Sequence, residues 1–167
     1  DQIRLIPIIS IHHHHLKSKV LYWYIEIVNI LDLPKLSILS IGNEAFGNST
    51  IFHLSNLNSL QSLNIGNNKF NQVSTFMIEG FQSLTTLSIG SNSFTQKKND
   101  YGNDIDKSKS FHILNCTKLE SIEIGEYSFS DYGGQFELNN LPELQSLIIG
   151  SNSTDSYNFY SSSSFEI

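Results

Sequence analysis

The chain has 167 residues, of which 39% are hydrophobic and only 16% charged, so neutral polar side chains carry much of its solubility. Ten lysines and arginines against sixteen acidic residues give a net charge of −6, which argues against a nucleic-acid partner. The single cysteine excludes an internal disulfide, and Glu26 and Asn29 interrupt the longest apolar run, so no membrane span is predicted in this segment.

Residues 1–27 are either a degenerate first repeat or an irregular lead-in, because their many isoleucines fit the repeat described below only loosely. The tract His12–His15 is of a kind that binds transition metals loosely. However, consecutive residues of an extended chain point in different directions, and no cysteine or acidic residue lies at ligand spacing. No specific metal site and no cofactor are therefore predicted.

Residues 28–154 contain five units, each marked by the dipeptide Ile-Gly, with the glycines 24, 24, 35 and 25 residues apart. Apolar residues stand one, three, six and nine positions before each glycine, and a second apolar pair stands fourteen and twelve positions before it. A phenylalanine follows the first four glycines by four residues, and this aromatic column fails at Thr154. The glycines are Gly42, Gly66, Gly90, Gly125 and Gly150.

The spacing within a unit predicts a short strand that ends at the glycine, since apolar residues one and three positions before it share one face. The upstream pair predicts a second short strand, and the three-residue leucine spacing between the two predicts a 3₁₀ or helical turn. One unit is too small to bury its apolar face alone, so the units must stack as a repeat solenoid with the phenylalanines in ladders.

Segments such as LQSLNIGNNKF and LTTLSIGSNSF resemble the leucine-rich repeat pattern L-x-x-L-x-I-x-x-N-x-F. They are most similar to the Ile-Gly variants of surface or secreted proteins of microbial eukaryotes, and more distantly to bacterial surface antigens. The resemblance implies a curved right-handed solenoid with a parallel sheet on its concave side. It also implies that the asparagines of the pattern bond backbone groups of neighbouring coils; they map onto Asn68, Asn92 and Asn152, with departures at Glu44 and Tyr127.

The outward positions of the strand before each glycine, together with the residue after the glycine, form the candidate partner-binding face. Short hydroxyl and amide side chains dominate these positions, with an acidic spot in the fourth unit and no aromatic anchor of the kind common in hot spots. A plain solubilising surface is the competing interpretation. The candidate residues are Ser62, Asn64, Asn67, Thr86, Ser88, Ser91, Ser121, Glu123 and Glu126. For the glycines, a turn or bulge at the strand end is favoured over close approach of a ligand.

An 11-residue excess near residues 95–108 must loop out of the third unit, and its Tyr101 is a further candidate contact residue. The run from Asp104 to Ser108 starts like a calcium loop but lacks the required glycine and closing glutamate, so no calcium site is predicted. Cys116 takes a leucine position and is predicted to be buried. His53 and His112 share a register position, which predicts equivalent exposure.

No nucleophile–base pair, carboxylate pair or phosphate-binding glycine loop stands out, so the chain is not expected to be an enzyme. We expect noncovalent binding of a protein, or alternatively a glycan, at a cell surface or outside the cell. An intracellular scaffold, or the recognition arm of a multidomain signalling protein or enzyme, is the alternative. Residues 155–167 read as the start of a further repeat, which together with the first residue, Asp1, predicts a segment of a longer protein.

Overall fold

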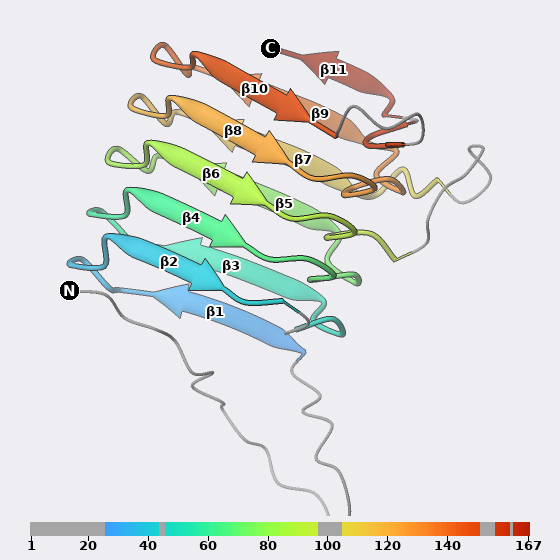
Figure 1. Cartoon of the computed structure of the whole chain (residues 1–167), viewed down its shortest axis with the longest axis horizontal. Coiled ribbons are helices and arrows are strands. Elements are labelled where there is room, and N and C mark those ends of the chain that lie inside the picture. The colour runs from blue at the N-terminus through green and yellow to red at the C-terminus, as the bar shows by residue number, and fades with distance from the viewer. Residues whose placement is uncertain (1–25, 44–45, 97–104, 151–155, 161) are drawn as a thin grey trace, which may run out of the picture.

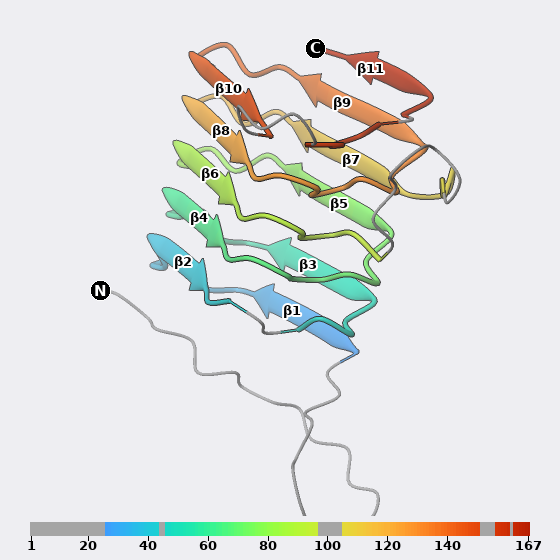
Figure 2. The same ribbon diagram turned by 45° about the vertical axis from the view of Figure 1, so that its right-hand side comes forward.

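The computed structural model describes residues 26–43, 46–96, 105–150, 156–160 and 162–167. The chain winds into stacked coils, and each full coil contributes one strand to each of two layers (Figures 1 and 2). Every strand pairing is parallel and joins a strand to its equivalent in a neighbouring coil. The protein is therefore a parallel β-solenoid of about five turns, and the described residues contain no helix.

One layer is an unbroken five-stranded sheet, called here the continuous sheet, in the order β10-β8-β6-β4-β2. Its strands end directly before the five glycines, as the spacing predicts. Alternate side chains point into the core, where Leu63 and Ile65 of the second strand are buried. The strands are β2 (Ile38–Ile41), β4 (Ser62–Ile65), β6 (Thr86–Ile89), β8 (Ser121–Ile124) and β10 (Ser146–Ile149).

The other layer, called here the interrupted sheet, consists of two blocks, β1-β3 and β11-β9-β7-β5, with no ladder between β3 and β5 although both strands are fully described. The ring centroids of Phe52 and Phe76 on these two strands lie 6.3 Å apart, whereas those of Phe76 and Phe111 lie 5.1 Å apart. The strands are β1 (Ile27–Leu31), β3 (Ile51–Ser55), β5 (Thr75–Glu79), β7 (Ser110–Leu114), β9 (Gln135–Asn139) and β11 (Ser164–Glu166).

Phenylalanines fill the core in two ladders, which confirms the predicted aromatic columns. In the column after the glycines, Phe94 stacks on Phe129 with centroids 4.8 Å apart and planes within 4°. In the fifth unit, where Thr154 interrupts the sequence pattern, Phe159 continues the ladder and stacks on Phe129 at 5.0 Å. Phe159 follows its glycine by nine residues rather than four, so the ladder continues across a longer connection.

The predicted 3₁₀ or helical turns are single turns instead. Between the two strands of a coil, one hydrogen bond between residues three positions apart closes a single turn, for example from the amide of Leu60 to the carbonyl of Leu57 at 2.9 Å. The same bond recurs at Leu36, Leu84, Leu119 and Leu144. Only six residues separate the strands Ile51–Ser55 and Ser62–Ile65, which leaves no room for a second helical turn.

A second turn feature is a column of residues in the left-handed region, one directly after each of β1, β3, β5, β7 and β9 of the interrupted sheet. Asparagine, aspartate and glycine accept positive φ more readily than other residues, and they alone occupy this column. The residues are Asp32, Asn56, Gly80, Asn115 and Asn140, with φ between 54° and 72°. This pattern recurs with the repeat and could have been found from the sequence.

Candidate functional site

Six of the predicted contact residues lie together on the outer face of the continuous sheet. The register aligns Ser62, Thr86 and Ser121 in one row across β4, β6 and β8. A second row contains Asn64, Ser88 and Glu123. All six are partly or fully exposed, so the structure assembles one polar surface from three coils.

Part of this surface is already hydrogen-bonded within itself. The hydroxyl of Thr86 donates to that of Ser62 at 3.0 Å, and the amide of Asn64 donates to the same hydroxyl at 3.1 Å. The side chain of Asn64 also reaches Ser40 of the preceding coil at 3.5 Å. These bonds hold the polar side chains in fixed positions relative to one another.

Asn67 and Ser91, although predicted to face a partner, serve the stacking of the coils. The side-chain oxygen of Asn43 accepts the backbone N–H of Asn67 at 2.9 Å, and that of Asn67 accepts the N–H of Ser91 at 2.8 Å. Both residues therefore belong to an asparagine ladder at the edge of the continuous sheet, and their polar groups are engaged by neighbouring coils.

This ladder also explains Gly66 and Gly90 of the glycine column, for which a turn or bulge was the favoured interpretation; at Gly42 nothing lies within 4 Å of a Cβ, and Gly150 has a positive φ of 80°. Gly66 and Gly90 do not have positive φ. A Cβ built on Gly66 would lie 2.5 Å from Oδ1 of Asn43 and 2.9 Å from its backbone nitrogen. Glycine is required here because the preceding coil packs against its Cα, so the close approach is made by the protein itself.

The asparagine column does not bond neighbouring coils through its side chains as the resemblance implies. Asn68 and Asn92 instead occupy the left-handed region with φ of 58° and 56°, and Tyr127 and Tyr157 take the same place in later coils. The side-chain oxygen of Asn92 is buried without a hydrogen-bond partner. Asn152 and Glu44 lie outside the described residues.

The residue after the asparagine column, rather than the asparagine itself, bonds the neighbouring coil through its side chain. The hydroxyls of Ser93 and Ser128 donate to the carbonyls of Gly66 and Gly90 at 2.9 and 2.6 Å. In the last coil the side-chain amide of Asn158 donates to the carbonyl of Gly125 at 2.7 Å. A short polar side chain at this position thus satisfies a glycine carbonyl of the previous coil.

The acidic spot and an apolar residue meet on the outer face of β8 and β10. Glu123 is exposed and pairs in register with Ile148, which is 52% exposed. Glu126 is partly buried, and its carbonyl accepts the backbone N–H of Asn92 at 2.8 Å. None of the outward side chains of β2, β4, β6, β8 and β10 is basic, so this end of the face is electronegative.

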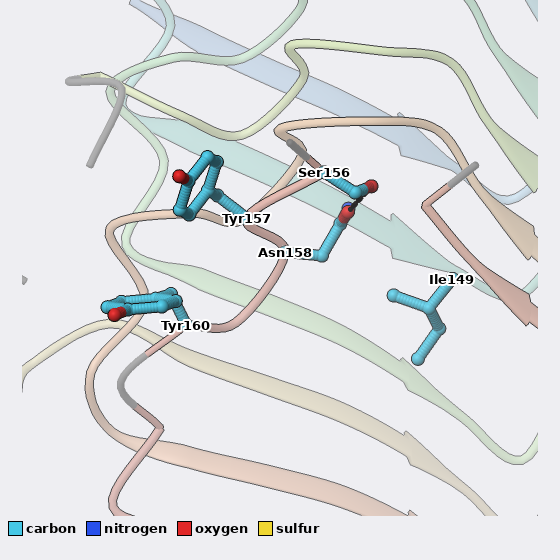
Figure 3. Close-up of a pocket in the computed structure, with 5 residues that line it drawn as sticks. All are labelled: Ile149, Ser156, Tyr157, Asn158 and Tyr160. Atoms are coloured by element: carbon cyan, nitrogen blue, oxygen red, sulfur yellow. Dashed lines mark hydrogen bonds between the residues drawn. The ribbon is translucent and has the colours of Figure 1, made fainter. Parts of the chain in front are cut away.

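Three tyrosines beside the carboxyl ends of β8 and β10 were missed from the sequence; we call them the tyrosine ledge. The rings of Tyr127 and Tyr157 lie 5.7 Å apart, and those of Tyr157 and Tyr160 lie 5.5 Å apart. Tyr157 and Tyr160, with Ile149, line a hollow of about 380 Å³, and Figure 3 shows how these side chains lie. The repeated triplets Tyr-Ser-Phe and Tyr-Asn-Phe at 127–129 and 157–159 were the available signal.

Within the same hollow, the hydroxyl of Ser156 donates to the side-chain oxygen of Asn158 at 2.8 Å (Figure 3). The carbonyl of Ser156 accepts the backbone N–H of Tyr127 at 2.7 Å, which joins the two coils that carry the ledge. Exposed tyrosine rings beside hydroxyl and amide groups combine apolar contact area with hydrogen-bonding capacity.

Several other sequence candidates have structural explanations or lie outside the described residues. Tyr101 and the tract His12–His15 lie outside them. Asp106 forms a local turn in which the hydroxyl and the N–H of Ser108 both donate to its carboxylate, and these bonds lower the pKa of Asp106. Cys116 is buried as predicted, and loss of solvation raises its pKa.

The two histidines at equivalent positions are not equally exposed, contrary to the prediction. His53 is exposed on β3, whereas the side chain of His112 on β7 is only 13% exposed. Nδ1 of His112 lies 3.0 Å from a carboxylate oxygen of Glu137 on the adjacent strand. Within the described ranges, no three His, Cys, Asp or Glu side chains gather closely enough to hold a metal ion.

A buried ion pair lies where the 11-residue excess leaves and rejoins the coils. Nζ of Lys109 lies 2.8 Å from the carboxylate of Asp131, and both side chains are 4% exposed. The same carboxylate accepts the backbone N–H of Gln96 at 3.2 Å. These bonds fasten the base of the excess segment through one carboxylate oxygen of Asp131, whereas its other oxygen is buried without a hydrogen-bond partner.

Comparison with known protein families, curated proteins and solved structures finds no match to this chain. No helix in the described part of the chain is long and apolar enough to cross a membrane.

Proposed function

We propose that this chain is a noncovalent protein-binding module of leucine-rich repeat type, with the continuous sheet on its concave side, in a longer surface or secreted protein. The partner binds across the outer face of β4, β6 and β8 and is anchored at the tyrosine ledge. The observation that supports this function is the in-register surface of short, mutually bonded polar side chains that ends beside exposed tyrosine rings.

The chemistry of this surface suits a partner that docks on a rigid platform. Serine, threonine and asparagine side chains lose little conformational entropy when covered, and those of this face are already held by hydrogen bonds. Tyrosine is enriched among residues that dominate binding energy, because a single ring supplies a large rigid contact area. In this proposal the polar face provides a rigid surface that complements the partner's shape, and the tyrosine ledge provides most of the binding energy.

The test compares two matched charge reversals on opposite sheets. Glu123→Lys changes the proposed face, and Glu79→Lys changes an equally exposed glutamate on the outer side of the interrupted sheet. Each variant is immobilised and incubated with surface and secreted proteins from the source cells, and the bound proteins are quantified. We expect a partner retained by the unchanged chain and by Glu79→Lys but reduced at least about tenfold by Glu123→Lys. Equal capture by both variants would reject this face.

The exposed ring of Tyr160 and the half-buried ring of Tyr157 favour a glycan as the second candidate ligand, because aromatic rings beside hydroxyl groups offer both stacking and hydrogen bonds. Oligosaccharide array binding that is lost in Tyr160→Ala and kept in Glu79→Lys would support a glycan. Array binding that is the same in both variants would reject the ledge as a glycan site.

A further inference from the structure

The interrupted sheet carries a row of metal-binding side chains on the face opposite the proposed partner surface. Met77 on β5 pairs in register with His112 on β7, and His112 pairs in register with Glu137 on β9. In-register neighbours of a parallel sheet lie roughly 4.8 Å apart with their side chains on one side. His53, on β3, lines the same groove as Met77 across the break between β3 and β5. The row therefore brings two imidazoles beside a thioether.

The contact between His112 and Glu137 determines which nitrogen is available. An ionised carboxylate only accepts hydrogen bonds, so Nδ1 of His112, 3.0 Å from Glu137, carries the proton. In the neutral ring Nε2 then holds a free lone pair. Within the described residues, no hydrogen bond is made by Nε2 of His112. Metal-binding histidines have this arrangement, since a carboxylate on the other nitrogen orients the ring and increases its basicity.

Met77 is the second donor, and its position is unusual for its type. It is the single methionine of the chain, and 47% of it is exposed on the outer face of the sheet. A thioether sulfur is a soft ligand, which favours Cu(I) and similar ions over Zn²⁺, Ca²⁺ or Mg²⁺. Metal bonds of about 2.0–2.3 Å to nitrogen and sulfur place the two donors roughly 4 Å apart, which matches neighbouring strands.

The break in the sheet lets the third residue, His53, reach the same groove as Met77. Where β3 and β5 separate, a groove of about 490 Å³ opens between them, and His53, Met77 and Glu79 are among its walls. The phenylalanines beneath are 6.3 Å apart, so the gap is too narrow to admit another strand, which needs about 4.8 Å on each side. His53 and Met77, from opposite walls, open onto this same groove.

We propose that Met77 and His112, with His53 across the groove, form a binding site for a soft monovalent metal ion of the Cu(I) class. Glu137 is a positioning residue that holds His112 in its metal-binding tautomer. The site lies on the sheet opposite the proposed partner face and is independent of it.

The single methionine gives the experiment one reporter. The full chain is labelled with ¹³C-methyl methionine and His12–His15 are replaced by asparagine, so that this tract does not compete for the ion. Ag(I), a redox-stable probe of the same class, is titrated while the single methyl resonance is followed. We expect the resonance to shift and saturate at one equivalent, and to stay unchanged with Ca²⁺ or Mg²⁺. An unchanged resonance with Ag(I) would overturn the proposal.

Three variants then separate the site from adventitious binding to a surface methionine. His112→Gln raises the apparent Kd for Ag(I) at least about tenfold, and Glu137→Gln raises it by about tenfold through loss of ring orientation. Glu79→Gln, which changes the same groove without removing a soft donor, leaves the Kd within about twofold. Equal affinity in the unchanged chain and in His112→Gln, with matching circular dichroism spectra, would show that methionine alone binds and would reject the site.

Discussion

The two sheets are built by the same coils from the same repeat, yet one is continuous and the other is interrupted. In the continuous sheet the N–H groups of the last four glycines of the column bond to the coil before, as from Gly66 to Ile41 at 2.8 Å and from Gly90 to Ile65 at 2.7 Å. In the interrupted sheet the ladder stops between β3 and β5, although equivalent residues of the two strands are 24 apart, as on the continuous side. Repeat length therefore does not determine whether two strands pair.

The difference coincides with a change in aromatic packing. In later coils the strand phenylalanine meets the turn phenylalanine edge to face, as for Phe76 with Phe94 at 76° and Phe111 with Phe129 at 77°. Phe52 instead tilts at 41° over Phe70. On the continuous side, side chains such as Asn43 and Asn67 add bonds between coils. The break between β3 and β5 therefore coincides with a change in how the strand phenylalanine packs on the turn phenylalanine.

The largest expected effect distinguishes the two blocks of the interrupted sheet. Phe111 lies about 5 Å from the rings of Phe76, Phe129 and Phe136, so Phe111→Ala should lower the free energy of unfolding by about 4 kcal/mol. Phe52→Ala should cost at least about 1 kcal/mol less, because Phe52 has one close ring and two at 6.0 Å or more. Urea unfolding measures both, and equal losses would show that the wider spacing does not weaken packing.

The next effect tests the close stacking of the continuous sheet with a matched pair. A Cβ on Gly90 would lie 2.8 Å from the backbone nitrogen of Asn67, so Gly90→Ala should destabilise the protein by about 2 kcal/mol. Nothing lies within 4 Å of a Cβ on Gly42, so Gly42→Ala should stay within about 0.5 kcal/mol of the unchanged chain. Thermal unfolding separates the two, and similar losses would contradict the steric role of the column.

A smaller effect concerns Tyr132, whose hydroxyl donates to the carbonyl of Val73 at 2.7 Å just before β5. This bond ties β5 to the later coils, on the side away from β3. Tyr132→Phe should lower stability by about 1–2 kcal/mol at neutral pH, since it removes this buried hydrogen bond. It should also change how stability depends on pH.

Burial raises the pKa of Tyr132 well above its usual value, and the nearby carboxylate of Asp131 adds to the shift. Above pH of about 10 the unfolded chain releases this proton while the folded chain retains it, so folding stability falls as pH rises. The difference in unfolding free energy between the unchanged chain and Tyr132→Phe should therefore shrink between pH 8 and pH 11. A constant difference would show that Tyr132 ionises normally in the folded protein.

The smallest effect is local and needs no substitution. The N–H of Gly80 points to Leu114 on the β7 side, so by strand alternation the amides of Met77 and Glu79 point toward β3, where no ladder forms. In β6 both edges are paired. Hydrogen exchange at Met77 should be at least about tenfold faster than at Ser88 in the middle of β6. Equal protection would mean that β3 and β5 pair in solution.

Much of the fold follows from the sequence because its signals are local and repeated. Alternation such as Leu63-x-Ile65 defines the strands, and the stacking of equivalent positions then defines the parallel pairing. The break between β3 and β5 could not be predicted, since Phe52 and Phe76 are the same residue at the same repeat position and differ in how they pack on the turn phenylalanines Phe70 and Phe94. Phe159 was missed because a fixed offset from Gly150 assumes constant connection length.

The position of the candidate face could be predicted from the sequence, but the contacts that its residues make with neighbouring coils could not. Alternation correctly placed Ser62, Asn64 and Ser88 on the outer face. At Asn67 and Ser91 the alternation has ended with the strand, and the backbone N–H of each donates to an asparagine side chain of the preceding coil, so their contact with a partner stays a prediction. The tyrosine ledge depends on two coils meeting through the contact of Tyr127 with Tyr157, and the sequence signals it only indirectly, through the repeated triplets at 127–129 and 157–159.

Asp131 holds both ends of the excess segment, so the sequence between those ends can change without disturbing the coils. Its backbone carbonyl accepts the N–H of Asp106 at 3.0 Å, and its carboxylate accepts that of Gln96, so one residue fastens both stems of the excess segment. The number of residues between the two stems therefore does not affect the spacing of the coils. Lengthening a loop also adds little entropic penalty. Foreign peptides grafted between these stems should be displayed from the side of the solenoid while the stack beneath stays folded.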